Sequence, residues 1–358
     1  MKLLQIISLL VLAGIIFSGC TSPSSQESDT NSDLTIYTSI YPIQFAVEQI
    51  GGDSVSVKSL YPPGVDAHTY EPTSKDMTTI AKSDAFIYMG AGMEGFAQSA
   101  ADALESQDLS LVELGQHEEL FHVDENLEHE EDSEHEEERE EEHEEHEHED
   151  HEEEHEEHEE HEHEDHEEEH EDHEGQVEDD GHNHGDLDPH IWLDPKRMLE
   201  MSHIIKSELI TLNPEKSDLY NKNFQALKED LLVLDEQFTE TLQSKTNKEI
   251  LVSHAAYGYW EERYGIEQIA INGLSSSSEP SQKELTEIID QAEKHHLEYI
   301  IIEQNSTNNV SKIIQDQIGA QTLEIHNLSV LTDNDIDKEK DYFSIMYQNL
   351  DVLDQVTN

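Results

Sequence analysis

The chain has 358 residues, which is enough for two domains with a sizeable core. Its 85 Asp and Glu residues against 19 Lys and Arg give a formal net charge of −66. This charge excludes binding to nucleic acids by phosphate neutralisation and argues against docking on anionic lipid through a basic face. A single cysteine allows neither a disulfide within the chain nor a thiolate metal cluster.

The first twenty residues have the pattern of a secretory signal. Lys2 precedes an apolar run over residues 3–17, and small residues then lead to Cys20. The run is short for a hydrocarbon core of about 30 Å, which disfavours the alternative of an uncleaved anchor helix. The pattern resembles a bacterial lipoprotein signal, in which the cysteine carries the lipid. We therefore expect a signal peptide over 1–20, a lipid anchor on Cys20, a flexible polar tether over 21–33, and a location on the extracytoplasmic face of the cell membrane.

From residue 34 onward, short apolar runs alternate with helical patterns. Such alternation predicts βαβ units and parallel sheets. The predicted strands of this first block are 34–40, 55–60, 85–89 and 109–114, and the predicted helices are 43–50, 74–82 and 96–104. A further helix is predicted over 195–212. Together these elements make up an N-terminal lobe over 34–213.

Residues 117–185 form an acidic, histidine-rich stretch within that lobe. They hold 17 of the 24 histidines, and EEEHEEHEHEDH at 140–151 is followed by two similar repeats. A run of this kind has little to bury and repels itself, so we expect a disordered insertion. Its closely spaced imidazoles offer weak auxiliary metal sites, although a solvated acidic spacer is the alternative. The auxiliary candidates are His143, His146, His148, His151, His155, His158, His161, His163, His166, His170 and His173.

A long helical pattern runs from residue 215 to about 242. Its apolar residues recur at helical spacing and form one stripe: Leu219, Phe224, Leu227, Leu231, Leu234, Phe238 and Leu242. About 28 residues at 1.5 Å each give a rod of roughly 40 Å. We expect residues 214–246 to be a stiff linking helix between two lobes, the alternative being a helix buried within one domain.

After this helix the alternation of strands and helices resumes. The predicted strands are 249–253, 266–271, 299–302 and 321–325, and the predicted helices are 257–264, 281–295, 310–318 and 342–356. These elements predict a C-terminal lobe over 247–358. The fold class expected for the whole body is therefore α/β, with two Rossmann-like parallel-sheet lobes joined by a long rigid helix.

Four residues outside the insertion lie where a metal could be bound. His68 lies in a Pro/Gly-rich turn after a strand, and His190 follows the insertion directly. His254 and Glu303 stand at the ends of two strands of the second block. Because ligands of parallel sheets bind at the carboxyl ends of strands, these side chains can converge in a cleft between the lobes. Three imidazoles and one carboxylate suit Zn²⁺, whereas calcium and magnesium prefer more oxygen ligands.

The segments around these residues carry a specific resemblance. They are HTYEPT at 68–73, PHIWLDP at 189–195, SHAAYGY at 253–259, GLSSSSEPS at 273–281 and IIIEQN at 300–305. In this order they are similar to the substrate-binding lipoproteins of zinc ABC importers, over residues 34–356. The resemblance implies that His68, His190, His254 and Glu303 bind Zn²⁺ as the transported ligand. It also implies two lobes joined by a rigid helix, no enzymatic activity, and an ABC permease and its ATPase as partners.

The sequence is also compatible with other functions. A manganese-binding or adhesin-type member of the same family is one, although manganese-binding relatives carry carboxylates at the third and fourth ligand positions. A second is a zinc enzyme in which three histidines bind the metal and Glu303 acts as a general base. His326 could compete as a ligand, whereas Glu71 and Asp194 fit capping or supporting roles better. We also expect that removing residues 118–185 leaves one tight zinc site.

Overall fold

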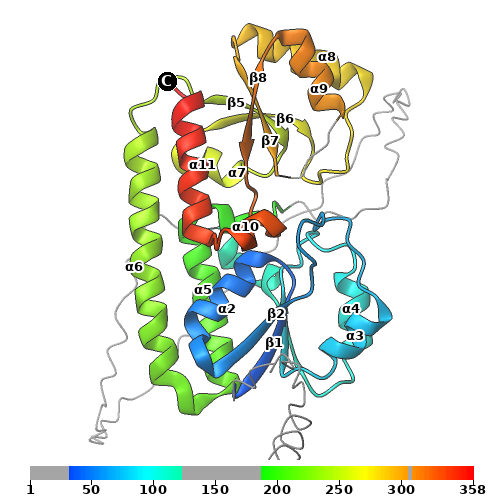
Figure 1. Cartoon of the computed structure of the whole chain (residues 1–358), viewed down its shortest axis with the longest axis vertical. Coiled ribbons are helices and arrows are strands. Elements are labelled where there is room, and N and C mark those ends of the chain that lie inside the picture. The colour runs from blue at the N-terminus through cyan, green and yellow to red at the C-terminus, as the bar shows by residue number, and fades with distance from the viewer. Residues whose placement is uncertain (1–31, 123–186, 305–308) are drawn as a thin grey trace, which may run out of the picture. The chain divides into compact units, whose positions relative to one another are not determined.

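The computed structural model describes residues 32–122, 187–304 and 309–358, and it contains two parallel sheets (Figure 1). The first sheet has the order β2-β1-β3-β4 and the second the order β6-β5-β7-β8. The strands of the first are β1 (Leu34–Thr38), β2 (Val55–Ser59), β3 (Ala85–Tyr88) and β4 (Ser110–Glu113). Those of the second are β5 (Glu249–His254), β6 (Glu267–Asn272), β7 (Tyr299–Glu303) and β8 (Gln321–Ile325). The predicted α/β fold class is confirmed.

Helices connect the strands within each lobe and pack against the sheet of that lobe. In the first lobe they are α2 (Tyr41–Gly51), α3 (Ser74–Ile80) and α4 (Ala97–Leu104), followed by α5 (Pro195–Leu212). In the second they are α7 (Gly258–Tyr264), α8 (Gln282–Lys294), α9 (Asn309–Ile318), α10 (Asp333–Asp337) and α11 (Tyr342–Val356). The short α10 was not predicted, although Thr332 and Asp335 form a capping box that marks its start.

The linking helix α6 (Ser217–Leu242) contacts elements of both lobes. It packs against α2 and α5 of the first lobe and against α7 and α11 of the second, and Figure 1 shows it running beside both. Its buried stripe begins at Tyr220, whereas Leu219, which we expected in the stripe, is exposed. The reason is the helical period: Tyr220 precedes Phe224 by four residues, but Leu219 precedes it by five.

One hydrophobic core runs through both lobes. It includes Ile36 and Ile87 of the first sheet, Leu231 of α6, and Val252 and Ile325 of the second sheet. A smaller second cluster lies between the second sheet and α8 and α9. Separation of the lobes would therefore expose apolar surface at the cost of about 25 cal/mol per Å².

The folded body extends further toward the histidine-rich stretch than expected. Two short 3₁₀ helices, Leu114–Gln116 and Glu118–Leu120, continue the chain after β4. Leu120 is fully buried, and the carbonyl oxygen of Phe121 accepts a hydrogen bond from Arg197 Nη2. Assignment of residues 117–122 to a disordered insertion was therefore wrong. The physical reason is that Leu120 and Phe121 are an apolar pair, which packs into the core.

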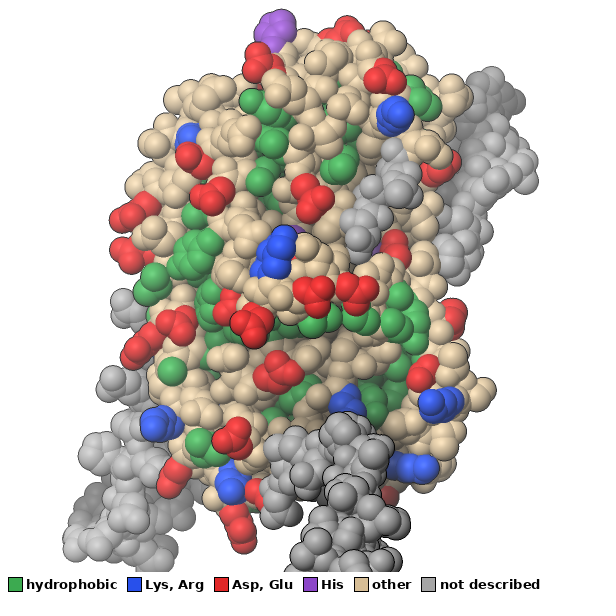
Figure 2. Space-filling view, viewed as in Figure 1, with side chains coloured by type: hydrophobic (Ala, Val, Ile, Leu, Met, Phe, Trp, Pro, Cys, Tyr) green, Lys and Arg blue, Asp and Glu red, His purple; other side chains and the backbone are tan. Residues whose placement is uncertain are grey.

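The remaining N-terminal and insertion predictions lie outside the described residues. These are the signal peptide, Cys20, nearly all of the tether, and the auxiliary histidines. Among the described residues, no helix is both long and apolar enough to cross a membrane. Acidic side chains are spread over the face shown in Figure 2, with Lys and Arg between them, as expected for a moderately acidic body.

Candidate metal centre

The second sheet places two of the predicted site residues next to each other. In its order, β6-β5-β7-β8, the chain moves from β5 to one side of the sheet and then continues with β7 on the other side. The parallel strands β5 and β7 are paired through Val252 and Ile301. Such a switch point leaves a crevice at the carboxyl ends of the two strands. His254 is the last residue of β5 and Glu303 the last residue of β7, so both side chains belong to this crevice.

His190 is positioned by a turn at the start of α5. A 3₁₀ helix, Ile191–Leu193, follows it, and Asp194 then caps α5 by accepting a hydrogen bond from the Lys196 backbone N–H. The backbone N–H of His190 donates to Asp188 Oδ1 at 3.0 Å, and its Nδ1 lies 2.8 Å from the same oxygen. Asp188 therefore fixes the ring and leaves Nε2 to face the crevice.

The third imidazole comes from the loop after β2. In this loop the Tyr61 hydroxyl donates to the carbonyl of Ala67, and the backbone N–H of His68 donates to Asp66 Oδ1. Asp66 Oδ2 accepts a 2.5 Å hydrogen bond from Ser276 Oγ of the second lobe. The loop is therefore tied to the serine-rich segment 274–278 opposite it.

The structure brings the three imidazoles together. Each of His68, His190 and His254 offers one ring nitrogen, and these atoms all lie within 4.8 Å of one another. Nε2 of His254 lies 3.4 Å from Nε2 of His190. His190 and His254 are almost fully buried, whereas His68 is partly exposed and borders a cavity of about 350 Å³. The cavity gives solvent access to the cluster.

Glu303 contacts this cluster through the far side of the His254 ring. Its Oε1 lies 2.6 Å from Nδ1 of His254, on the side away from His190, and it accepts a 3.0 Å hydrogen bond from the Tyr257 hydroxyl. Its Oε2 accepts a 2.8 Å hydrogen bond from Asn327 Nδ2. The structure thus groups three of the four predicted ligands and holds the fourth against one of them.

The charges of His254 and Glu303 are coupled. Burial, the largest influence, lowers the pKa of His254, but Glu303 and the more distant Asp66 and Asp188 together raise it above its ordinary value. Burial likewise raises the pKa of Glu303, yet His254, Tyr257 and His190 together lower it. Without a metal, the pair therefore favours an imidazolium beside a carboxylate.

The donor set fits Zn²⁺ on chemical grounds. Three imidazole nitrogens with a carboxylate within reach match the nitrogen and oxygen donors that zinc takes in a tetrahedron. A divalent ion bound by Nε2 of His254 would take the place of the proton on that nitrogen, and the carboxylate of Glu303 would offset part of the added positive charge. Hard oxygen-seeking cations would find too few oxygen atoms there.

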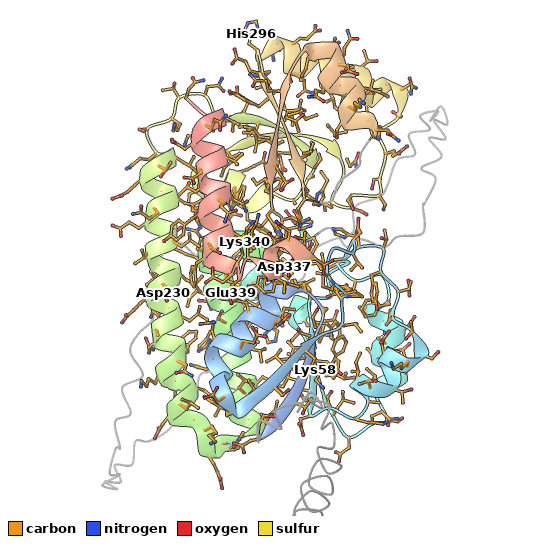
Figure 3. All side chains as sticks on the ribbon, in the orientation of Figure 1. Lys58, Asp230, His296, Asp337, Glu339 and Lys340 are labelled. Atoms are coloured by element: carbon orange, nitrogen blue, oxygen red, sulfur yellow. The ribbon has the colours of Figure 1, made fainter. Side chains whose placement is uncertain are left out.

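Four further described histidines lie outside this cluster. His326 Nδ1 accepts from the Leu328 backbone N–H, and its Nε2 lies 3.2 Å from Asp335 Oδ2, which is itself paired with Lys340. His295 pairs with Glu249, and the ring of His203 lies against Phe224. His296 is at the outer end of the second lobe, away from Asp337 and Lys340 (Figure 3). None of these four belongs to the described ligand group.

Two residues that contact Glu303 were not singled out from the sequence. Tyr257 lies in the SHAAYGY segment three residues after His254, so its motif was a usable signal. Asn327 directly follows His326 in a segment without recognisable ligand spacing, and nothing in the sequence pointed to it. Glu71 is exposed, and the cap of α3 that follows it is formed by Thr73.

Comparisons with known proteins relate the chain to zinc-uptake proteins. Residues 36–356 match the family model described as zinc-uptake complex component A, periplasmic. The chain is 28% identical over 343 residues to the zinc-binding lipoprotein AdcA of Streptococcus pneumoniae serotype 4, covering 93% of this chain but 58% of AdcA. It is 29% identical over 341 residues to the high-affinity zinc uptake system protein ZnuA of Bacillus subtilis, covering 95% of this chain and 93% of that protein.

A solved structure shows the same fold. The crystal structure of the Zn(II)-bound ZnuA-like domain of S. pneumoniae AdcA aligns with a TM-score of 0.64 and 26% identity. The alignment covers 90% of this chain and 98% of that domain. The chain thus spans little more than half the length of the streptococcal relative, and what it shares is the part that contains this domain.

Proposed function

Because the chain belongs to the family of the zinc-uptake complex component A, we propose that it captures Zn²⁺ outside the cytoplasm and hands it to an ABC permease for import. The observation that carries this proposal is the convergence of three imidazoles from separate segments, their ring nitrogens within 4.8 Å of one another. The relatives named for zinc binding and zinc uptake support the choice of metal.

In this proposal His68, His190 and His254 bind the ion through ring nitrogens, and Glu303 is the fourth ligand. Glu303 faces Nδ1 of His254, whereas Nε2 faces His190, so a carboxylate oxygen of Glu303 would have to turn from Nδ1 toward the ion to bind it. A site with four protein ligands suits capture and delivery, because no open position is left for a reactive water. The family is one of transport proteins, which disfavours the alternative of a zinc enzyme.

Delivery requires that the ion can leave the site. The shared core and the contacts of α6 hold the two lobes together, so release must come from distortion of the site when the protein docks on its permease. A partner can drive that change only by binding the distorted state more tightly than the resting one. We further propose that a lipid on Cys20 holds the protein at the outer face of the membrane.

Removal of residues 124–182 tests the assignment of the site. These residues lie outside the described part of the chain, and a deletion with these bounds spares the buried Leu120 and Phe121, unlike the wider 118–185 deletion. We expect the shortened protein to lose most of its total zinc capacity yet to retain one tight site, measured by metal content and competition with a chelator. His254→Ala in the same background should remove that site. A shortened protein without a tight site would refute the location in the crevice.

The affinity for zinc should fall as the pH is lowered. The ligand imidazoles must be neutral, and Glu303 raises the pKa of His254 above its ordinary value of 6.5, so protons should begin to compete above that pH. Glu303→Gln removes the negative charge that raises the pKa of His254, whereas the burial that lowers this pKa remains. The pH at which the affinity for zinc falls should therefore be lower in this variant. Apparent dissociation constants measured between pH 5 and pH 8.5 check both curves. A pH dependence that is identical in the two proteins would contradict the coupling.

A further inference from the structure

Asn327 is bonded through every polar atom it has. It lies in the segment that leaves β8 and returns toward the first lobe. Its side-chain oxygen accepts from Gln304 Nε2 at 2.8 Å, from Ser329 Oγ at 2.8 Å and from the Ser329 backbone N–H at 3.1 Å. A backbone N–H can only donate, so the side-chain atom facing Ser329 must be the oxygen. The amide nitrogen therefore faces the other way, toward Glu303.

The amide nitrogen donates to Oε2 of Glu303 at 2.8 Å. Glu303 is only 6% exposed, and a hydrogen bond to a buried charged group is worth more than one between neutral groups. Tyr257 anchors the other oxygen, Oε1. The two donors hold the carboxylate at the mouth of the β5–β7 crevice, where neither Lys nor Arg pairs with it among the described residues.

The backbone of Asn327 reaches the first lobe. Its carbonyl accepts a 2.8 Å hydrogen bond from the indole N–H of Trp192, which lies two residues after His190. Its neighbour Leu328 has a left-handed backbone with φ of 62°, a conformation that is strained for a leucine. His326 Nδ1 accepts from the Leu328 N–H and so holds this strained turn in place. The turn fixes one residue between the two segments that supply His190 and Glu303.

We propose that Asn327 is a positioning residue for the zinc site: it sets the place of the Glu303 carboxylate relative to the imidazole of His190 across the two lobes. This proposal rests on the proposed function, since it requires Glu303 to act on the bound ion. Asn327 does not touch the ion in this scheme. It acts through Glu303, so its contribution vanishes when Glu303 is absent.

A double-mutant cycle in the full chain tests this dependence. Zinc affinity is measured by competition with a strong chelator, so that weak sites stay empty, and His190→Ala reports any binding outside the crevice. We expect Asn327→Ala to weaken zinc binding about 10-fold to 100-fold, the range for partners that support a metal ligand. Asn327→Ala combined with Glu303→Ala should bind no more weakly than Glu303→Ala alone. Losses that add in the double variant would overturn the proposal.

The visible spectrum of bound Co²⁺ reports the coordination of the metal and does not change merely because a variant is less stable. With less than one equivalent of Co²⁺, the wild-type difference spectrum against His190→Ala should show the strong visible bands of a four-coordinate site. In Asn327→Ala the bands should shift or weaken, because the carboxylate is no longer held. Asn349→Ala is the matched control, since Asn349 bonds both backbone groups of His326 but does not touch Glu303. An equal spectral change in Asn349→Ala would refute a specific role for Asn327.

Asn327→Asp has nearly the shape of the wild-type side chain and tests the proposal even if Asn327→Ala does not fold. Asn327→Asp keeps an oxygen toward Ser329 but turns a second, charged oxygen toward Glu303 instead of a donor. It should bind zinc more weakly than the wild type by a similar factor, and unchanged or tighter binding would overturn the proposal. A wild-type protein whose tight site survives His190→Ala would instead refute the proposed function itself, which separates the two failures.

Discussion

Replacement of His190 by alanine is expected to abolish tight zinc binding. His190 is fully buried, Asp188 fixes its ring, and its Nε2 lies 3.4 Å from Nε2 of His254. Loss of an outer partner of a metal ligand costs about 10-fold to 100-fold, so loss of a ligand itself should exceed 100-fold. Competition with a chromophoric chelator at pH 7.5 measures the change directly.

Two other histidines provide controls for this experiment. His203 lies in α5, with its ring against Phe224, and His326 is held by Leu328 and Asp335. Neither belongs to the imidazole group, so His203→Ala should leave the affinity unchanged. His326→Ala should lower it only indirectly, through the turn that carries Asn327. A loss in His326→Ala as large as that in His190→Ala would reopen the possibility that His326 is a ligand.

Replacement of Asp194 by alanine is expected to have the largest effect on stability. Asp194 and Arg197 are both almost fully buried, with Asp194 Oδ2 2.6 Å from Arg197 Nη1. Asp194 Oδ1 also accepts from Arg263 Nε of α7 in the second lobe and from the N–H of Lys196 at the start of α5. Removal of one partner leaves a buried charge poorly compensated, which costs about 3–5 kcal/mol. Chemical denaturation of the metal-free protein measures this loss.

Glu262 provides the matched comparison for Asp194. It also pairs with Arg197, at 2.8 Å, but 58% of its side chain is exposed. Exposed ion pairs contribute little, so Glu262→Ala should cost less than about 1 kcal/mol. Equal losses in the two variants would show that burial of the Asp194 pair is not what stabilises this junction. Because Asp194 also joins α5 to α7 through Arg263, its loss should also weaken zinc binding by loosening His190.

The sequence was sufficient for the architecture and for placing His254 and Glu303 at strand ends. Alternation of apolar runs with helical patterns predicted parallel sheets, and parallel sheets place their functional residues at strand ends. His254 at the end of β5 and Glu303 at the end of β7 follow from that rule alone. Element ends shifted by one to a few residues, as at α2, where a proline in the first turn lets the helix begin at Tyr41.

Only the tertiary structure decided how the site is assembled. It put Glu303 against Nδ1 of His254, aimed the amide of Asn327 at the same carboxylate, and joined Asn327 to Trp192, 135 positions away in the chain. It also drew Leu120 into the core. Periodicity reports which face of an element is apolar, because that is a property of neighbouring residues. Side-chain pairs between distant segments depend on how two lobes pack, and no local pattern in the chain carries that information.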